Sequence, residues 1–462
     1  MALEKEFYTL KSSNDKLSPD KNRNTFNALN ENIKKFLSFV GPGYVIAVGY
    51  LDPGNWATDL SAGSQFGYRL LFVLFFSNIM TIILQSLSIK LGVVTGLDLA
   101  QACKVFWPKY INYILYILCE LAIIACDLAE VIGSAIALKL LFSIPLPWGV
   151  AITGLDVMVL LLFYRSNDMQ ASRILESLIM TLIGGVGICF ILEVIYSKPD
   201  SREVLKGFSP NLNEIFLNSA ELYVTIGLIG ATVMPHNLYL HSHLVKNTIK
   251  LSIIDLMVAL LIALFVNLAI LIVSASNFYY HDRYGVIVVA NLFDAYNLLK
   301  KFIGQAAATI FAFALLLSGQ SSMLAVTIAG QIVMEGFIGL ELPPWLRGLF
   351  TRSVAILPAM FIAIIEGSNG LNSLLISSQV ILSLYLPFAV IPLIYFTSTR
   401  KIMKVDIREI IKPLGSPDVL IKDEKYLIDF SNSLYLVIIS CIICIIILVL
   451  DLYLIYYFIK HS

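Results

Sequence analysis

Two short segments of this chain carry residue types that bind metal ions, and each interrupts a long apolar run. The first reads DPGN from Asp52, and the second reads MPHN from Met234. Together they offer a carboxylate, amides, a thioether and an imidazole. A thioether among oxygen ligands favours transition metals, because Mg²⁺ and Ca²⁺ prefer oxygen alone. The residue types therefore indicate a site for a divalent ion such as Mn²⁺ or Fe²⁺.

A proline follows the first residue of each segment. Proline breaks a helix, because it lacks an N–H group and clashes with the carbonyl four residues back. Pro53 therefore frees the carbonyl of Gly49, and Pro235 frees that of Ala231. Such backbone is tolerated at membrane depth only inside protein or beside a wet cavity. Matching breaks in two halves of a membrane chain indicate a transporter's binding site.

Both segments also have a purely structural interpretation. Asp52 could cap the half-helix that restarts after the break, and Met234 could fill space in an apolar core. A charge in the middle of a membrane span is costly and indicates function. The two breaks also fall at corresponding places, which favours ligation over packing for both residues.

The elements that must position these residues are membrane helices. The chain has 462 residues, 58% hydrophobic and 14% charged, against about a quarter charged in soluble domains. Lysine and arginine total 32, as do aspartate and glutamate, so nothing indicates a nucleic-acid or nucleotide partner. A bilayer is spanned by about 20 apolar residues. Eleven such stretches are present, at 38–64, 69–94, 112–142, 147–165, 172–197, 219–243, 252–276, 302–337, 350–366, 372–396 and 433–459.

The breaks lie in the first and sixth spans, so each unit holds five spans and the second unit is inverted. This predicts an all-α integral membrane protein with 11 transmembrane helices, built as a 5+5 inverted repeat. Most lysines and arginines fall on the side of the N-terminal tail, which predicts a cytoplasmic N-terminus and an extracytoplasmic C-terminus. The expected divisions are a flexible cytoplasmic tail, two repeats, a cytoplasmic loop and a peripheral last helix, at 1–36, 37–197, 198–398, 399–432 and 433–462.

Proton coupling would need titratable groups near the metal. His236 and His241 lie in the sixth span, and histidine titrates near neutrality. Asp127 and Glu130 are three residues apart in the third span and share one helix face. The histidines could instead be structural, and the two acids could be a buried pair held by arginine or by hydrogen bonds. A dication beside Asp52 favours its ionised form, which would link proton release to metal entry.

The other embedded acids and the six cysteines are interpreted as structural. The acids are expected at helix ends, interfaces or in ion pairs: Glu120, Asp156, Glu176, Glu193 and Asp255. The cysteines mostly sit inside apolar helices, which favours packing: Cys103, Cys119, Cys126, Cys189, Cys441 and Cys444.

At the two breaks the chain resembles the natural resistance-associated macrophage protein family of proton-coupled divalent metal transporters. The resemblance rests on DPGNW from Asp52 and ATVMPHNLYLHS from Ala231. It extends over about residues 38–400, with supporting stretches at 91–103, 126–138, 318–322, 329–337 and 386–398. It implies a leucine-transporter-type fold with broken helices 1 and 6, as in the family's bacterial manganese transporters.

The resemblance also implies roles for individual residues. Asp52, Asn55 and Met234 would bind the ion through their side chains, and Ala231 would bind it through its carbonyl. A proton route is implied through Asp52, Glu130, Asp127 and Arg352.

Some features depart from the family pattern. Relatives commonly carry glutamine before LPFA in the tenth span, where this chain has Tyr385, with Gln379 about two turns earlier. Both are candidate contacts in an occluded state. The eighth span is less polar at 322–326, the link at 246–250 is short, and His243 adds an imidazole beside it. We therefore expect the ion range or the tightness of coupling to differ from typical members.

These features predict a secondary transporter rather than an enzyme, in the plasma membrane of a prokaryote. It would import Mn²⁺ and Fe²⁺ with protons by alternating access, with Cd²⁺, Co²⁺ and Zn²⁺ as further candidate substrates. No resident cofactor is expected, and the protein would act as a monomer in the lipid bilayer. Three alternatives stay open: a sodium-coupled amino-acid transporter of the same fold, a magnesium-selective relative and a metal receptor that does not transport.

Overall fold

The structure is a computed structural model that describes residues 49–154, 169–210, 215–216, 218–245, 249–280, 290–406 and 427–461. The tail 1–36, Asp156 and most of the loop 399–432 lie outside the described residues, as does the side chain of Glu176. Parts of the first and fourth expected spans also lie outside them.

The described chain is almost entirely helical. Its first half contains α4 (Pro53–Phe66), the 3₁₀ helix η1 (Gly67–Leu70), α5 (Leu71–Thr95), α6 (Leu99–Phe106), α7 (Lys109–Phe142), α9 (Met169–Ser197) and α10 (Ser201–Gly207). Its second half contains α12 (Ser219–Val233), α13 (Pro235–Leu244), α14 (Ile249–Ser274), the π-helical turn η2 (Ala275–Tyr279), α15 (Leu292–Phe302), α16 (Gln305–Ile338), α17 (Pro344–Ile365) and α18 (Gly367–Ser398). The antiparallel strands β1 (Lys404–Asp406) and β2 (Leu427–Asp429) then precede α20 (Leu434–His461).

The expected membrane character and both helix breaks are present. Within the described residues, seven helical segments are long and apolar enough to cross a bilayer. Helix α4 begins at Pro53, directly after the first break. Helix α12 ends at Val233 and α13 begins at Pro235, so the second break falls at Met234.

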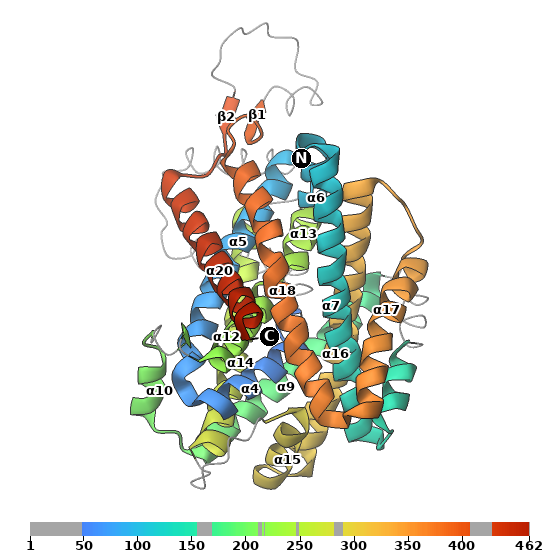
Figure 1. Cartoon of the computed structure of the whole chain (residues 1–462), viewed down its shortest axis with the longest axis vertical. Helices are drawn as coiled ribbons and strands as arrows, with labels where there is room; N and C mark the ends of the chain where they lie inside the picture. The colour runs from blue at the N-terminus through green and yellow to red at the C-terminus, as the bar shows by residue number, and fades with distance from the viewer. Residues whose placement is uncertain are drawn as a thin grey trace, which may run out of the picture.

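The broken helices lie in the middle of the bundle. Long helices α7, α16 and α18 run lengthwise beside them, and α20 lies on the outside against α18 (Figure 1). One end of the molecule carries α6, α13 and the β1–β2 hairpin, whereas the other end carries α10 and α15 (Figure 1). Helix α20 exposes much of its apolar surface, and its buried Asp451 accepts a hydrogen bond of 3.0 Å from Ser383 on α18.

Two glycines let neighbouring helices approach the breaks closely. A Cβ added to Gly133 of α7 would lie 2.2 Å from the ring of Pro53, so only glycine fits there. A Cβ on Gly230 of α12 would lie 2.0 Å from the backbone oxygen of Gln379 on α18. The first break is thus packed against α7, and the residues before the second break are packed against α18.

Candidate metal centre

At the first break, Asp52 caps the helix that restarts after it. One carboxylate oxygen accepts a hydrogen bond of 2.7 Å from the backbone N–H of Asn55, which is the geometry of an N-cap. The other oxygen, Oδ2, is buried and has no hydrogen-bond partner among the described residues. The preceding carbonyls are satisfied by side chains: Asn267 donates to Tyr50, and Ser318 donates to Leu51. The capping interpretation of Asp52 therefore accounts for only one of its two oxygens.

At the second break, Met234 adopts a backbone conformation that is rare for a side-chain-bearing residue. Its φ is +42°, and such strain persists only where the surroundings enforce it, commonly at functional sites. The hydroxyl of Thr81 donates to the carbonyl of Thr232 at 3.1 Å. The sulfur of Met234 accepts from the amide of Asn237 at 3.4 Å.

The side chain of Asn55 joins the two breaks. Its Nδ2 donates to Asp52 Oδ1 at 2.9 Å and to the carbonyl of Ala231 at 3.1 Å. The structure therefore brings Asp52, Asn55 and the Ala231 carbonyl together in one buried place. Gly49 lies against the same region, since a Cβ there would sit 3.3 Å from the amide nitrogen of Asn237.

The acids expected on the proton route lie along α7. A carboxylate oxygen of Glu130 lies within 4.8 Å of one of Asp52. Both Glu130 oxygens are buried without a well-formed hydrogen bond among the described residues, and the Ser322 hydroxyl is beside them. One turn along α7, Asp127 Oδ1 lies 3.6 Å from the guanidinium of Arg352.

Two buried arginines of α17 each pair with one acid of α7. Arg352 is buried and also contacts the sulfur of Met323 and the carbonyl of Thr153. Arg347 makes two hydrogen bonds, of 2.7 and 2.8 Å, to the carboxylate of Glu120. The interpretation of Glu120 as a paired acid is confirmed by this contact.

The histidines of α13 have different surroundings. His241 Nδ1 lies 2.8 Å from Gln85 Oε1, and Gln85 donates to the hydroxyl of Tyr50 at 2.8 Å. His236 Nε2 lies 3.9 Å from the sulfur of Cys126. His243 lies 3.2 Å from Asp98, the N-cap residue of α6.

The two candidate contacts of α18 have different positions. Gln379 is fully buried, and a Cβ added to Gly54 would lie 2.0 Å from its side-chain nitrogen. Its side chain therefore lies directly beside the start of α4. Tyr385 is half-buried and packs against the apolar core.

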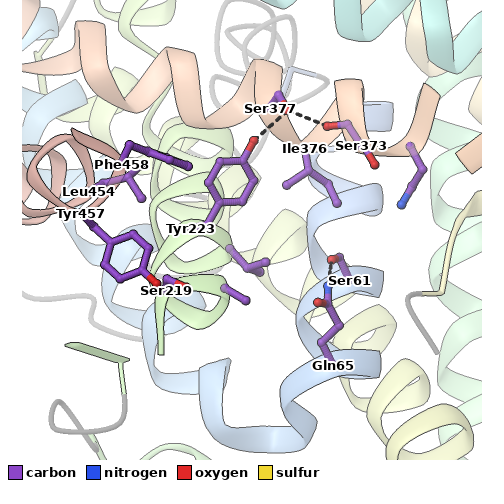
Figure 2. A pocket seen from close by; sticks show the side chains of 13 residues that line it. Ser61, Gln65, Ser219, Tyr223, Ser373, Ile376, Ser377, Leu454, Tyr457 and Phe458 are labelled. Atoms are coloured by element: carbon purple, nitrogen blue, oxygen red, sulfur yellow. Dashed lines mark hydrogen bonds between the residues drawn. The ribbon is translucent and has the colours of Figure 1, made fainter. Parts of the chain in front are cut away.

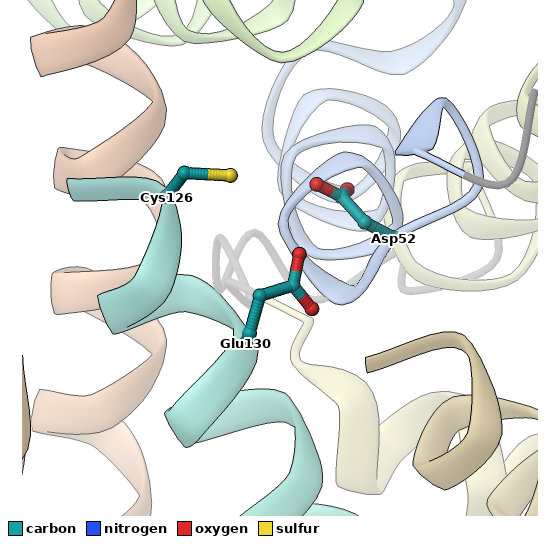
Figure 3. Close-up of side chains that lie close together, drawn as sticks. All are labelled: Asp52, Cys126 and Glu130. Atoms are coloured by element: carbon teal, nitrogen blue, oxygen red, sulfur yellow. The ribbon is translucent and has the colours of Figure 1, made fainter. Parts of the chain in front are cut away.

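Two residues of this region were missed by the sequence analysis. Cys126 packs in the apolar core as expected, and its sulfur also lies within 4.8 Å of carboxylate oxygens of both Asp52 and Glu130 (Figure 3). Its spacing of four residues from Glu130, which places both on one helix face, was the available signal. Asp59 is fully buried on α4, and neither oxygen has a hydrogen-bond partner among the described residues. An acid within a membrane span was the signal there.

A cavity of about 470 Å³ opens beyond the breaks, between α4, α12, α18 and α20 (Figure 2). Its thirteen described lining residues carry hydroxyl, amide and apolar groups and no charge. Along α4 and α12, Thr58 and Gly227 fall between the cavity-lining residues and the site residues Asn55 and Ala231. They pack together, because a Cβ on Gly227 would touch Thr58 at 3.5 Å. A packed layer therefore lies between this cavity and the site.

The comparison with protein families decides where the chain belongs. The model described as natural resistance-associated macrophage protein-like matches residues 43–414. The chain belongs to this family. The match includes both breaks and every residue expected at the metal site, and it agrees with the resemblance seen at the two motifs.

Relatives and solved structures of the family agree with this assignment. A divalent metal cation transporter from Nostoc is 53% identical over 80% of this chain and 85% of its own. A transporter of the same description from Listeria monocytogenes is 47% identical over 92% of this chain and 90% of its own. The structure resembles a manganese transporter from Eremococcus coleocola with a TM-score of 0.74 and 33% identity, over 95% of this chain and 88% of that one.

More distant structures show the fold alone. A nucleobase-cation symporter, Mhp1, matches with a TM-score of 0.57 at 15% identity, over 90% of this chain and 89% of that one. The fold is therefore the leucine-transporter-type arrangement that the family resemblance implies.

Proposed function

We propose that this protein transports divalent transition metal ions across the cytoplasmic membrane, importing Mn²⁺ and Fe²⁺ with protons. The observation that carries the proposal is the meeting of the two helix breaks at Asn55. This contact brings the carboxylate of Asp52 and the freed carbonyl of Ala231 into one buried site. Met234, with its thioether, lies at the second break, three residues after Ala231. Cd²⁺, Co²⁺ and Zn²⁺ are further candidate substrates, since the same mixed ligands suit them.

Alternating access is supported by the position of the cavity between α4, α12, α18 and α20. The packed layer of Thr58, Gly227 and Val380 lies between this cavity and the site. Each residue of the layer belongs to a different helix, α4, α12 or α18. Movement of these helices apart would open the site toward the cavity, and α13 would close it on the opposite side.

Proton coupling is supported by the row of acids on α7. A proton leaving Asp52 when the dication arrives has Glu130 as a neighbour within 4.8 Å. Asp127 and its partner Arg352 follow one turn further, toward the end of the molecule that carries α6 (Figure 1). These acids and Arg352 form a row of titratable and charged groups within the membrane, and such rows are typical of proton relays.

The proposal is tested by uptake of radiolabelled Mn²⁺ into proteoliposomes, with and without an acidic outer solution. We expect accumulation that the imposed gradient accelerates, accompanied by acidification of the vesicle interior. Asp52→Asn should abolish uptake, because a neutral amide replaces the only carboxylate at the first break. Asp451→Asn is the matched control, since this buried acid lies on the peripheral α20.

Three results would overturn the proposal. Uptake by the Asp52→Asn variant at the wild-type rate would show that Asp52 is not part of the transport site. Metal uptake that leaves the internal pH unchanged would show that transport is not coupled to protons. Metal binding without any uptake would favour a receptor instead.

A further inference from the structure

The thiol of Cys126 lies at the metal centre, next to two carboxylates. One ligand atom each from Asp52, Cys126 and Glu130 lies within 4.8 Å of the others, and all three residues are buried. Figure 3 shows Cys126 and Glu130 projecting from α7 toward Asp52 at the start of α4. Among the described residues, no other group of three histidine, cysteine or acidic side chains brings its ligand atoms this close together.

Several polar atoms around this group have no protein partner. Asp52 Oδ2, both Glu130 oxygens and His236 Nδ1 are buried without a well-formed hydrogen bond among the described residues. Buried polar atoms are normally paired, and each one left unpaired calls for an explanation such as a bound ion. The unpaired carboxylate oxygens therefore point to a cation as their partner, independently of the cysteine.

The geometry suits a cation after a small adjustment. For three atoms no more than 4.8 Å apart, some point lies within about 2.8 Å of all of them. Bonds from a zinc-like ion measure about 2.0 to 2.2 Å to carboxylate oxygen and about 2.3 Å to thiolate sulfur. Shifts of roughly half an ångström per side chain would complete these bonds. His236 Nε2, 3.9 Å from the sulfur, is the nearest nitrogen available as a further ligand.

We propose that Asp52, Cys126 and Glu130 form a second cation position beside the Asn55–Ala231–Met234 position, sharing Asp52 with it. Thiolate is the softest ligand of the region, so this position selects thiophilic dications such as Cd²⁺ over Mn²⁺. Binding exchanges the thiol proton for the cation, and that proton is released to solvent. The inference deepens the proposed function but depends on it only through the shared Asp52.

The test is a titration of the purified full-length protein with CdCl₂, followed by the ultraviolet absorption of the cadmium–thiolate bond. We expect the band in the wild type and its loss in Cys126→Ser, together with a loss of Cd²⁺ affinity of roughly ten-fold or more. Mn²⁺ affinity should fall less than Cd²⁺ affinity, because Mn²⁺ has the weaker preference for thiolate. Cys119→Ser is the matched control, because Cys119 is buried on α7 in the same apolar core but lies outside the group of Asp52, Cys126 and Glu130, and it should keep the band.

The outcomes separate this inference from the proposed function. Met234→Ala should retain the cadmium–thiolate band, since the thioether belongs to the other position. A band in a protein that transports no metal would leave the site standing and overturn the transport proposal. X-ray absorption at the cadmium edge of Met234→Ala decides the matter even if Cys126→Ser fails to fold, because the thioether is then absent and a remaining cadmium–sulfur bond comes from a thiolate. No sulfur bond there, or a band that survives in Cys126→Ser, would overturn the inference.

Discussion

At the scale of single residues, Asp52 combines two roles that the sequence presents as alternatives. One oxygen caps α4 through the N–H of Asn55, and the other is buried and unpaired among the described residues. The capping hydrogen bond fixes the orientation of the carboxylate, so Oδ2 could bind a ligand without a change in the side-chain conformation of Asp52. The structural interpretation is confirmed for one oxygen, and metal binding by the other oxygen stays a prediction.

Met234 should decide which ions the site accepts. Met234→Ala removes the thioether and leaves oxygen ligands, which suit Ca²⁺ and Mg²⁺. We expect Ca²⁺ to compete with Mn²⁺ uptake about ten-fold better, a change of roughly 1.4 kcal/mol in relative affinity. The measurement is inhibition of radiolabelled Mn²⁺ uptake by increasing Ca²⁺. Met334→Ala, a buried methionine of α16, is the control, and equal Ca²⁺ inhibition in both variants would argue against sulfur ligation.

Single residues also show what sequence patterns miss. Asp52, Met234 and the acids of α7 can be chosen as candidates from the sequence alone. A proline follows Asp52 and Met234 within a membrane span, and a charged residue within a span is rare. Cys126 breaks no such rule, since a cysteine in an apolar helix is ordinary. Its place beside Asp52, which lies on a distant segment, depends on the packing of α7 against α4.

At the scale of elements, the positions of both breaks and their meeting at one site are predictable, whereas the hydrogen bonds of Asn55 that join them are not. The local chemistry of Pro53 and Pro235 determines where the helices end. The side chain of Asn55 bridges the breaks across 176 residues of sequence. Helix α7 is apolar around much of its circumference, so periodicity does not reveal which face packs on α4; Gly133 is the position where the approach to Pro53 is closest.

Gly133 should therefore be sensitive to the smallest substitution. In Gly133→Ala the new Cβ would lie 2.2 Å from the ring of Pro53, and overpacking of this kind costs about 1–3 kcal/mol. We expect a lower melting temperature in detergent and slower Mn²⁺ uptake. Gly184→Ala is the control, since no atom lies within 4 Å of an added Cβ there. Unchanged stability and uptake in Gly133→Ala would show that α7 does not pack against the break in this way.

At the scale of the whole molecule, the two ends differ in their elements. The hairpin of β1 and β2 marks one end and α10 marks the other (Figure 1). The bias of lysine and arginine predicts that the hairpin end is cytoplasmic. The order of helices follows from the spans and breaks, and the leucine-transporter-type fold follows from the family resemblance. The cavity between α4, α12, α18 and α20 depends on side-chain packing among four helices and has no signal in the sequence.

Cysteine labelling in intact cells tests this orientation. In a Cys441→Ser background, which removes the exposed native cysteine, a membrane-impermeant maleimide should label Ser201→Cys at the start of α10. It should not label Lys401→Cys beside the hairpin until the cells are opened. Both positions are exposed, so accessibility within the protein is matched. The reverse pattern would show that the topology is inverted and that the hairpin end faces the outside.

The central claim is that one ion is held between the two breaks, and anomalous X-ray diffraction at the manganese edge tests it most directly. Crystals grown with Mn²⁺ should show a single strong peak bonded to the carboxylate of Asp52, the carbonyl of Ala231 and the sulfur of Met234. A peak that contacts only one of the two breaks, or none, would contradict the account.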